Sequence, residues 1–278
     1  MSYEYKTEKV NWAAQYFDEF ADKEWHRLAR TPADRVSFEI HAHYLRTNIR
    51  DGARVLEIGA GPGKFTQVLA TLDCSVLVSD VSQVQLDLHK KYSKEYGFES
   101  CVEDWALLDV CDLSIFESAS FDAVVVYGGP LSYVFEDAGK ALEECVRVCK
   151  PGGAVLTSVM SMWGTVHRSL KGVLAIPAES NQKIVASGNV TKDNFEHTEH
   201  QCHMFRATEL NGLAVESGLK VEQLSASSCL SMGWAEDVFG EKDTQGAWDE
   251  LLRMEIEASA QEGCRDMGTH IILVGRKP

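Results

Sequence analysis

The stretch Arg54-Val55-Leu56-Glu57-Ile58-Gly59-Ala60-Gly61-Pro62-Gly63 decides how this 278-residue chain folds. Its first half is a short apolar run of strand length, and its second half has glycine at alternate positions. A helical pattern over 65–72 follows directly. Such a strand, turn and helix let backbone N–H groups approach a ligand closely. The stretch therefore predicts the first strand and the ligand-binding turn of an α/β sheet.

Strand and helix patterns alternate along the rest of the chain. Apolar runs predict strands at 54–58, 75–80, 100–103, 121–127, 154–160, 220–225 and 270–275. Helical spacing of apolar residues predicts helices at 11–30, 34–48, 65–72, 83–96, 138–149, 206–217 and 248–260. This alternation is typical of an α/β fold with a doubly wound, mostly parallel sheet and helices on both faces.

The alternation also suggests a domain organisation. Residues 1–50 are expected to form an N-terminal helical lid, and residues 51–278 one ligand-binding domain. Two segments at about 161–205 and 229–268 interrupt the strand–helix rhythm. We interpret them as caps over the carboxyl ends of the strands, where open α/β sheets bind ligands.

Composition narrows the function classes. The chain has 27 basic and 42 acidic residues, a formal net charge of −15, and no basic face for nucleic acid or an anionic membrane surface. Met1 to Val10 lacks the apolar core of a secretory signal, and no apolar run reaches the ~18 residues of a spanning helix. The eight cysteines are scattered without a CxxC pattern, so we expect free thiols in a cytoplasmic protein.

Two ligand classes compete for the glycine turn. A dinucleotide fingerprint needs a third glycine where this chain has Lys64. Glu57, two residues before the first glycine, would repel a pyrophosphate and would pair with a cation. S-adenosylmethionine carries an ammonium and a sulfonium, so the turn favours this methyl donor over a dinucleotide.

These residues resemble the class I S-adenosylmethionine-dependent methyltransferases, of the type that acts on small molecules. Glu57 to Gly63 is similar to the family's first motif, and Asp80 matches its ribose-binding acid. Arg147 to Gly153 is similar to its Pro-Gly-Gly turn. The resemblance covers residues 50–160 closely and the rest loosely. It implies a Rossmann-like sheet of seven strands with an antiparallel last strand.

The resemblance also implies the donor-binding residues. Asp104 would accept the adenine amino group and Trp105 would stack on the ring, although Trp105 is equally suited to the core. Tyr16 or Arg27 would reach the methionine carboxylate, with plain packing of the N-terminal helix as the alternative. The complete expected set is Tyr16, Arg27, Glu57, Gly59, Ala60, Gly61, Gly63, Asp80, Val81, Asp104, Trp105, Tyr127 and Gly128.

Candidates for the chemistry lie after the fourth strand and in the first cap. A hydroxyl or protonated amine acceptor needs a base. His203 is the first candidate, His167 the second, and Tyr133 is expected to line the acceptor pocket. His197, His200 and His203 recur every three residues, but this segment does not have a helical pattern, so no metal site is predicted.

The leading hypothesis is methyl transfer to an oxygen or nitrogen atom of a small metabolite, within secondary metabolism, by a monomer or homodimer. The Asn-Pro-Pro-Tyr signature of base and glutamine methyltransferases is absent, which argues against nucleic acid or protein amides as acceptors. Two alternatives stay open: an S- or arsenic-methyltransferase, suggested by the cysteine count, and a donor-binding subunit without catalysis of its own.

Overall fold

The computed structural model describes residues 8–27, 29–232 and 245–278. Parts of the expected lid (1–7) and of the expected second cap (233–244) lie outside the described residues. The helices are α1 (Glu8–Phe20), α2 (Lys23–Arg27), α3 (Pro32–Asn48), α4 (Lys64–Ala70), α5 (Gln83–Glu95), α6 (Pro130–Tyr133), α7 (Ala138–Val148), α8 (Met162–Arg168), α9 (Leu170–Val173), α10 (Ala178–Ser187), α11 (Ala207–Glu216) and α12 (Gln245–Ser259). Short 3₁₀ turns are η1 (Glu99–Cys101), η2 (Phe135–Asp137) and η4 (Glu262–Cys264).

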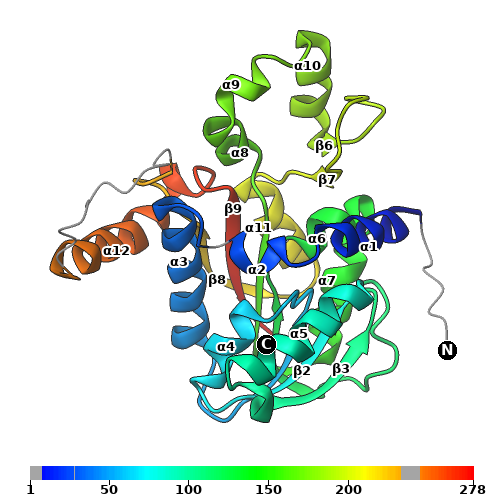
Figure 1. The fold of residues 1–278 in the computed structure, drawn as a ribbon, viewed down its shortest axis with the longest axis vertical. Coiled ribbons are helices and arrows are strands. Elements are labelled where there is room, and N and C mark those ends of the chain that lie inside the picture. Colours follow the sequence, from blue (N-terminus) through cyan, green and yellow to red (C-terminus); the bar gives the residue numbers. More distant parts are fainter. Residues whose placement is uncertain (1–7, 28, 233–244) are drawn as a thin grey trace.

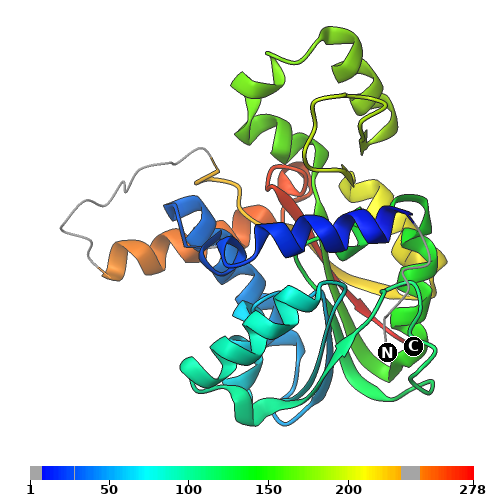
Figure 2. The same cartoon turned by 45° about the vertical axis from the view of Figure 1, so that its right-hand side comes forward.

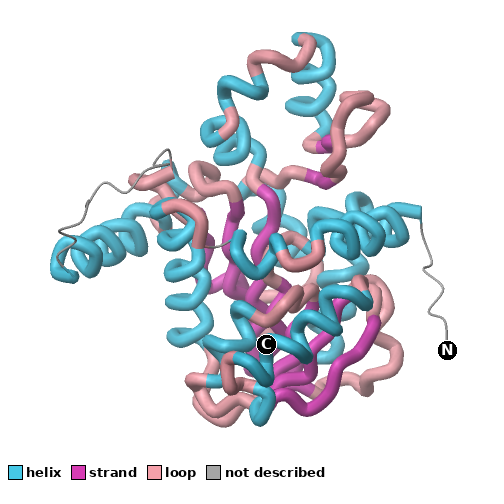
Figure 3. The backbone as a smooth tube through the Cα atoms, in the orientation of Figure 1, coloured by secondary structure: helices cyan, strands magenta, loops and turns pink. Residues whose placement is uncertain are grey.

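Seven strands form the central sheet (Figures 1 and 3). They are β1 (Arg54–Ile58), β2 (Ser75–Asp80), β3 (Val102–Leu107), β4 (Phe121–Val126), β5 (Cys149–Met160), β8 (Lys220–Ala226) and β9 (His270–Arg276). Their order is β3-β2-β1-β4-β5-β9-β8, and β9 runs antiparallel to both of its neighbours. This arrangement confirms the predicted doubly wound, mostly parallel sheet with an antiparallel last strand.

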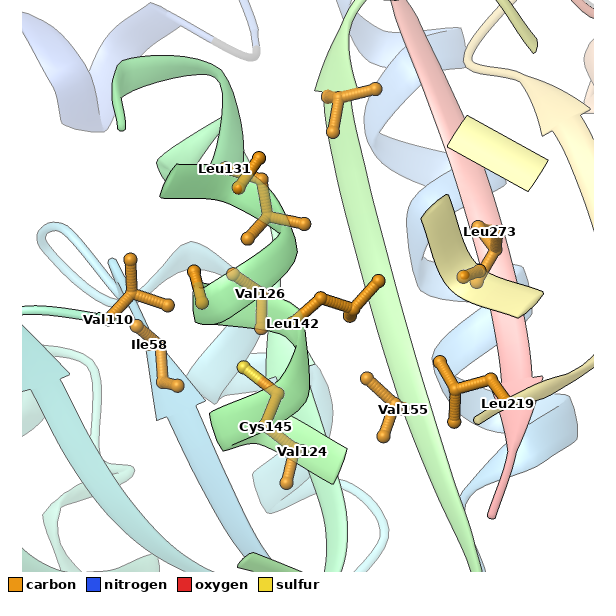
Figure 4. Close-up of a cluster of buried hydrophobic side chains, with 14 of the residues drawn as sticks. Ile58, Val110, Val124, Val126, Leu131, Leu142, Cys145, Val155, Leu219 and Leu273 are labelled. Atoms are coloured by element: carbon orange, nitrogen blue, oxygen red, sulfur yellow. The ribbon is translucent and has the colours of Figure 1, made fainter. Parts of the chain in front are cut away.

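Helices cover both faces of the sheet, as continuous apolar strands require. On one face, α6, α7 and α11 pack on the strands, and Figure 4 shows Leu131, Leu142 and Cys145 lying against them. On the other face, α3, α4 and α5 bury a second cluster that includes Ile40, Leu69 and Leu86.

The N-terminal segment differs from the single helix predicted over 11–30. Ala21 has a positive φ of 45°, which ends α1 and lets the chain turn into α2. The buried Gln85 side chain donates hydrogen bonds to the carbonyls of Phe17 and Ala21 at 2.9 and 3.2 Å. The two helices consequently lie across the carboxyl ends of the strands (Figures 1 and 2).

The first cap holds α8, α9, α10 and a two-stranded ladder of β6 (Asn189–Val190) and β7 (Cys202–His203). Figure 2 shows α8–α10 projecting beyond the same end of the sheet that α1 crosses. The base of the cap has no room for side chains. A Cβ added to Gly164 would lie 1.7 Å from the Gly268 carbonyl oxygen, and one added to Gly268 would lie 2.5 Å from the Ser227 nitrogen. Three backbone segments therefore touch directly at this point.

The segment between β8 and β9 is held by one buried carboxylate. Glu255 on α12 accepts backbone N–H bonds from Cys229, Leu230 and Ser231 at 2.6 to 3.1 Å. The Ser231 hydroxyl donates to the same carboxylate at 2.5 Å. These bonds fix the loop that leaves β8 onto the helix.

Candidate functional site

The glycine turn and the end of β2 are joined by the Asp80 carboxylate. Gly59, Gly61 and Gly63 have φ values of 67°, 53° and 99°, a region that favours glycine. The Gly61 N–H donates to Asp80 Oδ2 at 2.9 Å, and the Ser82 N–H donates to Oδ1 at 2.9 Å. Burial raises the pKa of Asp80 to about 6. The carboxylate thus fixes two turns at adjacent carboxyl ends of the sheet.

A cavity lies over these turns, with a volume of about 710 Å³ counting the part open to solvent. Its walls come from the carboxyl ends of β1 to β4 and from α1, α2, α5 and α6. The lining residues are Ala13, Phe17, Glu24, Ile58, Gly59, Gly61, Asp80, Val81, Gln85, Leu108, Asp109, Val110, Tyr127, Gly128, Pro130, Tyr133 and Val134. The structure therefore brings seven of the expected site residues together: Gly59, Gly61, Asp80, Val81, Tyr127, Gly128 and Tyr133.

The charges around this cavity suit a cationic ligand. Glu24, Asp80 and Asp109 supply three acidic side chains to its lining, and of these Glu24 is paired with Arg27. Glu57 lies outside the lining, 2% exposed, and burial raises its pKa to about 8. Carboxylates in a poorly hydrated place gain most from a cation, because their own desolvation is then offset by Coulomb attraction. This fits a donor that carries an ammonium and a sulfonium.

Arg27 and Tyr16 both lie at this end of the sheet, but neither lines the cavity. The Arg27 guanidinium pairs with the Glu24 carboxylate at 2.7 to 2.9 Å and lies beside Gly128. Tyr16 stacks on Trp12 and also packs against His200, with ring centroids 5.2 Å apart in each pair. In this structure Arg27 thus has an acidic partner on its own helix, next to the expected position of the donor.

Asp104 and Trp105 lie away from the cavity. The sequence predicts that the third strand ends at residue 103, whereas β3 continues to Leu107. Asp104 and Trp105 therefore pair with the middle of β2, and Leu108, Asp109 and Val110 reach the cavity in their place. The indole Nε1 of Trp105 donates to His89 Nδ1 at 3.0 Å. Ala60 and Gly63 are in the turn but outside the lining.

His203 and His167 are not brought to the cavity either. His203 is held between Asn189 Oδ1 at 2.6 Å and Glu209 Oε1 at 2.7 Å, so both ring nitrogens are engaged. His167 is exposed on α8. The reason is topological: β7 pairs with β6 within the cap, which turns His203 toward α11.

His200 does not line the cavity but contacts a residue that does, and sequence reasoning did not single it out as a base. Its Nε2 lies 3.1 Å from the Tyr133 hydroxyl, and Tyr133 lines the cavity. Burial and the nearby Arg27 lower the pKa of His200 to about 4. Burial raises the pKa of Tyr133 well above its usual range. Both side chains are therefore neutral near pH 7.

Other site classes find no support in the part of the chain that the structure describes. Its His, Cys, Asp and Glu side chains form no group of three that could hold a metal ion. None of its helices is long and apolar enough to cross a membrane. The eight cysteine thiols are free, and none of them lines the cavity.

Comparisons with known proteins agree with this geometry. Residues 55–153 match the model of a methyltransferase domain family. The ubiquinone biosynthesis O-methyltransferase of Paraburkholderia phymatum is 30% identical over 214 residues, which are 74% of this chain and 81% of that protein. The enzyme of the same name from Xanthomonas oryzae pv. oryzae is 32% identical over 40% of this chain and 44% of its own length.

Solved structures share the fold. One of them is geranyl diphosphate C-methyltransferase from Streptomyces coelicolor A3(2), in complex with Mg²⁺, geranyl diphosphate and S-adenosyl-L-homocysteine. Its TM-score is 0.60 at 17% identity, and the alignment covers 99% of this chain and all of that one. At this identity, the likeness concerns the fold alone.

Proposed function

Because this chain belongs to the class I S-adenosylmethionine-dependent methyltransferases, we propose that it methylates a hydroxyl oxygen of a small aromatic molecule. The pairing of Tyr133 with His200 at the cavity wall carries this proposal. The names of the O-methyltransferase relatives support an oxygen acceptor. A nitrogen acceptor is the alternative, and the experiment below separates the two.

The residues that would hold the donor are those at the glycine turn and the strand ends. Asp80 would accept the ribose hydroxyls, and Glu57 would supply negative charge near the turn. Leu108 and Val110 would provide apolar surface for the adenine in place of Trp105. The bound donor supplies an electrophilic methyl group on a sulfonium, and its thioether product leaves with no charge on sulfur.

The acceptor would lie on the side of the cavity where α1 and α6 meet. Phe17 packs edge-on against Tyr133 at a centroid distance of 5.3 Å, and Trp12 lies 6.5 Å from the same ring. Tyr16 and His200 complete this aromatic cluster. Flat rings gain from stacked and edge-on contacts of this kind, which supports an aromatic acceptor.

A hydroxyl acceptor must lose its proton as its oxygen bonds to the methyl group. Tyr133 lies between the cavity and His200, so we assign the proton route to this pair. The acceptor proton moves to the Tyr133 oxygen while the Tyr133 proton moves to Nε2 of His200. The new bond is between acceptor oxygen and methyl carbon, and the bond that breaks is between that carbon and the donor sulfur.

The cysteines do not support an S- or arsenic-methylating role. Burial raises the thiol pKa values of Cys101 and Cys202 to about 12, and neither thiol faces the cavity. Arsenic binding would need thiolates that face the acceptor, which the positions and pKa shifts of these cysteines do not provide.

Matched pairs of phenols and anilines, assayed for release of S-adenosyl-L-homocysteine, test the proposal. We expect turnover of a phenol and none of its amine counterpart. Turnover of anilines alone would overturn the assignment to oxygen. Aliphatic alcohols in the same panel provide a second check. If they are methylated in preference to every aromatic compound, the aromatic part of the proposal is refuted.

A further inference from the structure

Four side chains form a hydrogen-bond network beneath the glycine turn, outside the cavity lining. Trp105 Nε1 lies 3.0 Å from His89 Nδ1, and His89 Nε2 lies 2.8 Å from the Thr66 hydroxyl. The Thr66 hydroxyl lies 2.7 Å from Glu57 Oε2. His89 and Thr66 are both fully buried. The network links β3, α5, α4 and β1, and it ends on the Glu57 carboxylate next to the turn.

The direction of every hydrogen bond in this network follows from Trp105, its first member. An indole N–H only donates, so His89 Nδ1 must accept and carries a lone pair. Burial lowers the pKa of His89 to about 4, so the ring is neutral near pH 7 and its proton is on Nε2. Nε2 then donates to Thr66, which leaves the Thr66 proton for Glu57.

The backbone of the glycine turn leaves room for this network. A Cβ at Gly63 would lie 2.9 Å from His89 Nε2 and 3.0 Å from the Phe98 ring. A glycine at position 63 therefore lets the imidazole approach the turn closely enough to reach Thr66, the third residue after it. This contact gives the last glycine of the turn a reason to be there other than ligand approach.

We propose that Trp105, His89 and Thr66 are positioning residues for the donor site, which favour the charged form of Glu57 over its protonated form and fix the direction of its carboxylate. The inference rests on the donor site of the proposed function and adds residues that do not line the cavity. Oriented dipoles that end on a carboxylate stabilise its charged form. Their loss makes Glu57 easier to protonate and leaves a cationic donor with a weaker partner.

Other groups also act on Glu57 and stay unchanged in the experiment. Asp80 on β2 raises the pKa of Glu57 through its like charge. The Cys101 thiol in η1 is close enough for Glu57 to raise its pKa. From α4 and α5, Thr66 and His89 are the polar groups that join Glu57 in this network.

Thr66→Val removes the hydroxyl at nearly constant volume, and Thr66→Ser restores it. Calorimetric titration with S-adenosylmethionine from about pH 6 to 9 should show an affinity about tenfold lower at pH 7 in Thr66→Val, the typical effect of losing one hydrogen bond to a charged group. The affinity should recover at higher pH, and Thr66→Ser should follow the unmodified protein. Thr71→Val is the matched control, because Thr71 bonds only the Val68 carbonyl near the end of the same helix.

Two further measurements do not depend on how Thr66→Val folds. Trp105→Phe should shift the same pH profile upward, because it removes the indole N–H donor and keeps an aromatic side chain. The ¹⁵N signals of His89, identified by their loss in His89→Asn, should report a protonated Nε2 and an unprotonated Nδ1.

Three results would overturn the inference. The first is an unshifted pH profile in folded Thr66→Val, and the second is a Thr66→Ser variant that binds the donor as weakly as Thr66→Val. The third is a His89 that is protonated on Nδ1. Each of these leaves the proposed function intact. Donor binding with no phenol turnover would refute the proposed function alone, and an unmodified protein that binds no donor would refute both.

Discussion

The Tyr133 hydroxyl lies 3.1 Å from Nε2 of His200, a contact that joins α6 to the segment before β7. Sixty-seven positions separate the two residues in the chain. The pair sits at the boundary between the expected donor site and the cap, so it links the two parts of the protein that a methyl transfer has to bring together.

Replacing Tyr133 by Phe should lower kcat by roughly 10²-fold, the usual contribution of one proton-transfer group, because the acceptor proton loses its route to His200. The affinity for S-adenosylmethionine should change little, since the ring stays in place. Steady-state rates with the best phenol and calorimetry with the donor measure the two effects. Tyr96→Phe is the control, because Tyr96 is exposed and packs on Trp25 outside the cavity. Equal rates in Tyr133→Phe and the unmodified protein would contradict the role of Tyr133.

The pH dependence of kcat should reflect the lowered pKa of His200. A base works in its neutral form, so a pKa of about 4 keeps His200 active above that pH and inactivates it as the pH falls through about 4. At saturating donor and acceptor we expect kcat to stay level from about pH 5 to 8. Initial rates together with circular dichroism at each pH separate this loss from acid unfolding. A decline centred near pH 6.5 that disappears in His200→Asn would contradict the prediction.

Donor binding should release a proton near pH 7. In the donor-free protein, burial raises the pKa of Glu57 to about 8, so its carboxyl group is mostly protonated at pH 7. A cation beside it favours the charged form, and affinity therefore rises with pH until about 8 and then levels off. Calorimetry in two buffers of different ionisation enthalpy measures the protons released. Glu57→Gln should bind the donor more weakly and release fewer protons. An equal proton release in both proteins would refute the assignment of the released proton to Glu57.

Removing the Asp80 charge should weaken donor binding by about 1–3 kcal/mol, the typical value of a charge-assisted hydrogen bond. Asp80→Asn keeps the shape and one acceptor oxygen for the two turns, so the fold should persist. Asp51→Asn, on an exposed turn before β1, is the comparison that should bind normally. Competition titrations give both affinities, and unchanged binding in Asp80→Asn would exclude the proposed contact with the ribose.

Glu255→Ala should reduce the free energy of unfolding by about 3 kcal/mol, because it leaves several donors of the loop after β8 without their acceptor. Glu257→Ala on the same helix should cost less than about 1 kcal/mol, since Glu257 is exposed and pairs only with Arg253 and its own helix. Urea denaturation followed by tryptophan fluorescence compares them. Similar midpoints for the two variants would contradict the anchoring role of Glu255.

Local patterns were enough to predict the sheet and seven of the seventeen residues that line the cavity. Glu57 to Gly63 and Asp80 lie where an apolar run meets a turn, and such signals depend only on neighbours in the chain. The extent of β3 did not follow from its pattern, because 102–105 contains two exposed acids and lacks a continuous apolar run. Because β3 runs on to Leu107, Leu108 and Val110 line the cavity and Trp105 does not.

The other differences between expectation and structure depend on contacts between distant segments. Nothing in the residues around Ala21 signals a positive φ, since the stabilising partner is Gln85, sixty-four positions away. Likewise, His200 and His203 look alike in a segment without periodicity. Only the pairing of β6 with β7 turns one toward α11 and leaves the other beside Tyr133.

The bare backbone contact between Gly164 and Gly268 has a consequence for diversification of this enzyme. Because neither position has room for any side chain, both must stay glycine in a mutagenesis library or in a chimaera. Beyond that point the cap stays tied to the rest of the domain, because Arg168 pairs with Asp34 of α3 at 2.7 Å and His200 contacts Tyr133. A chimaera that replaces the cap therefore has to keep the two glycines, the Arg168–Asp34 pair and His200 together.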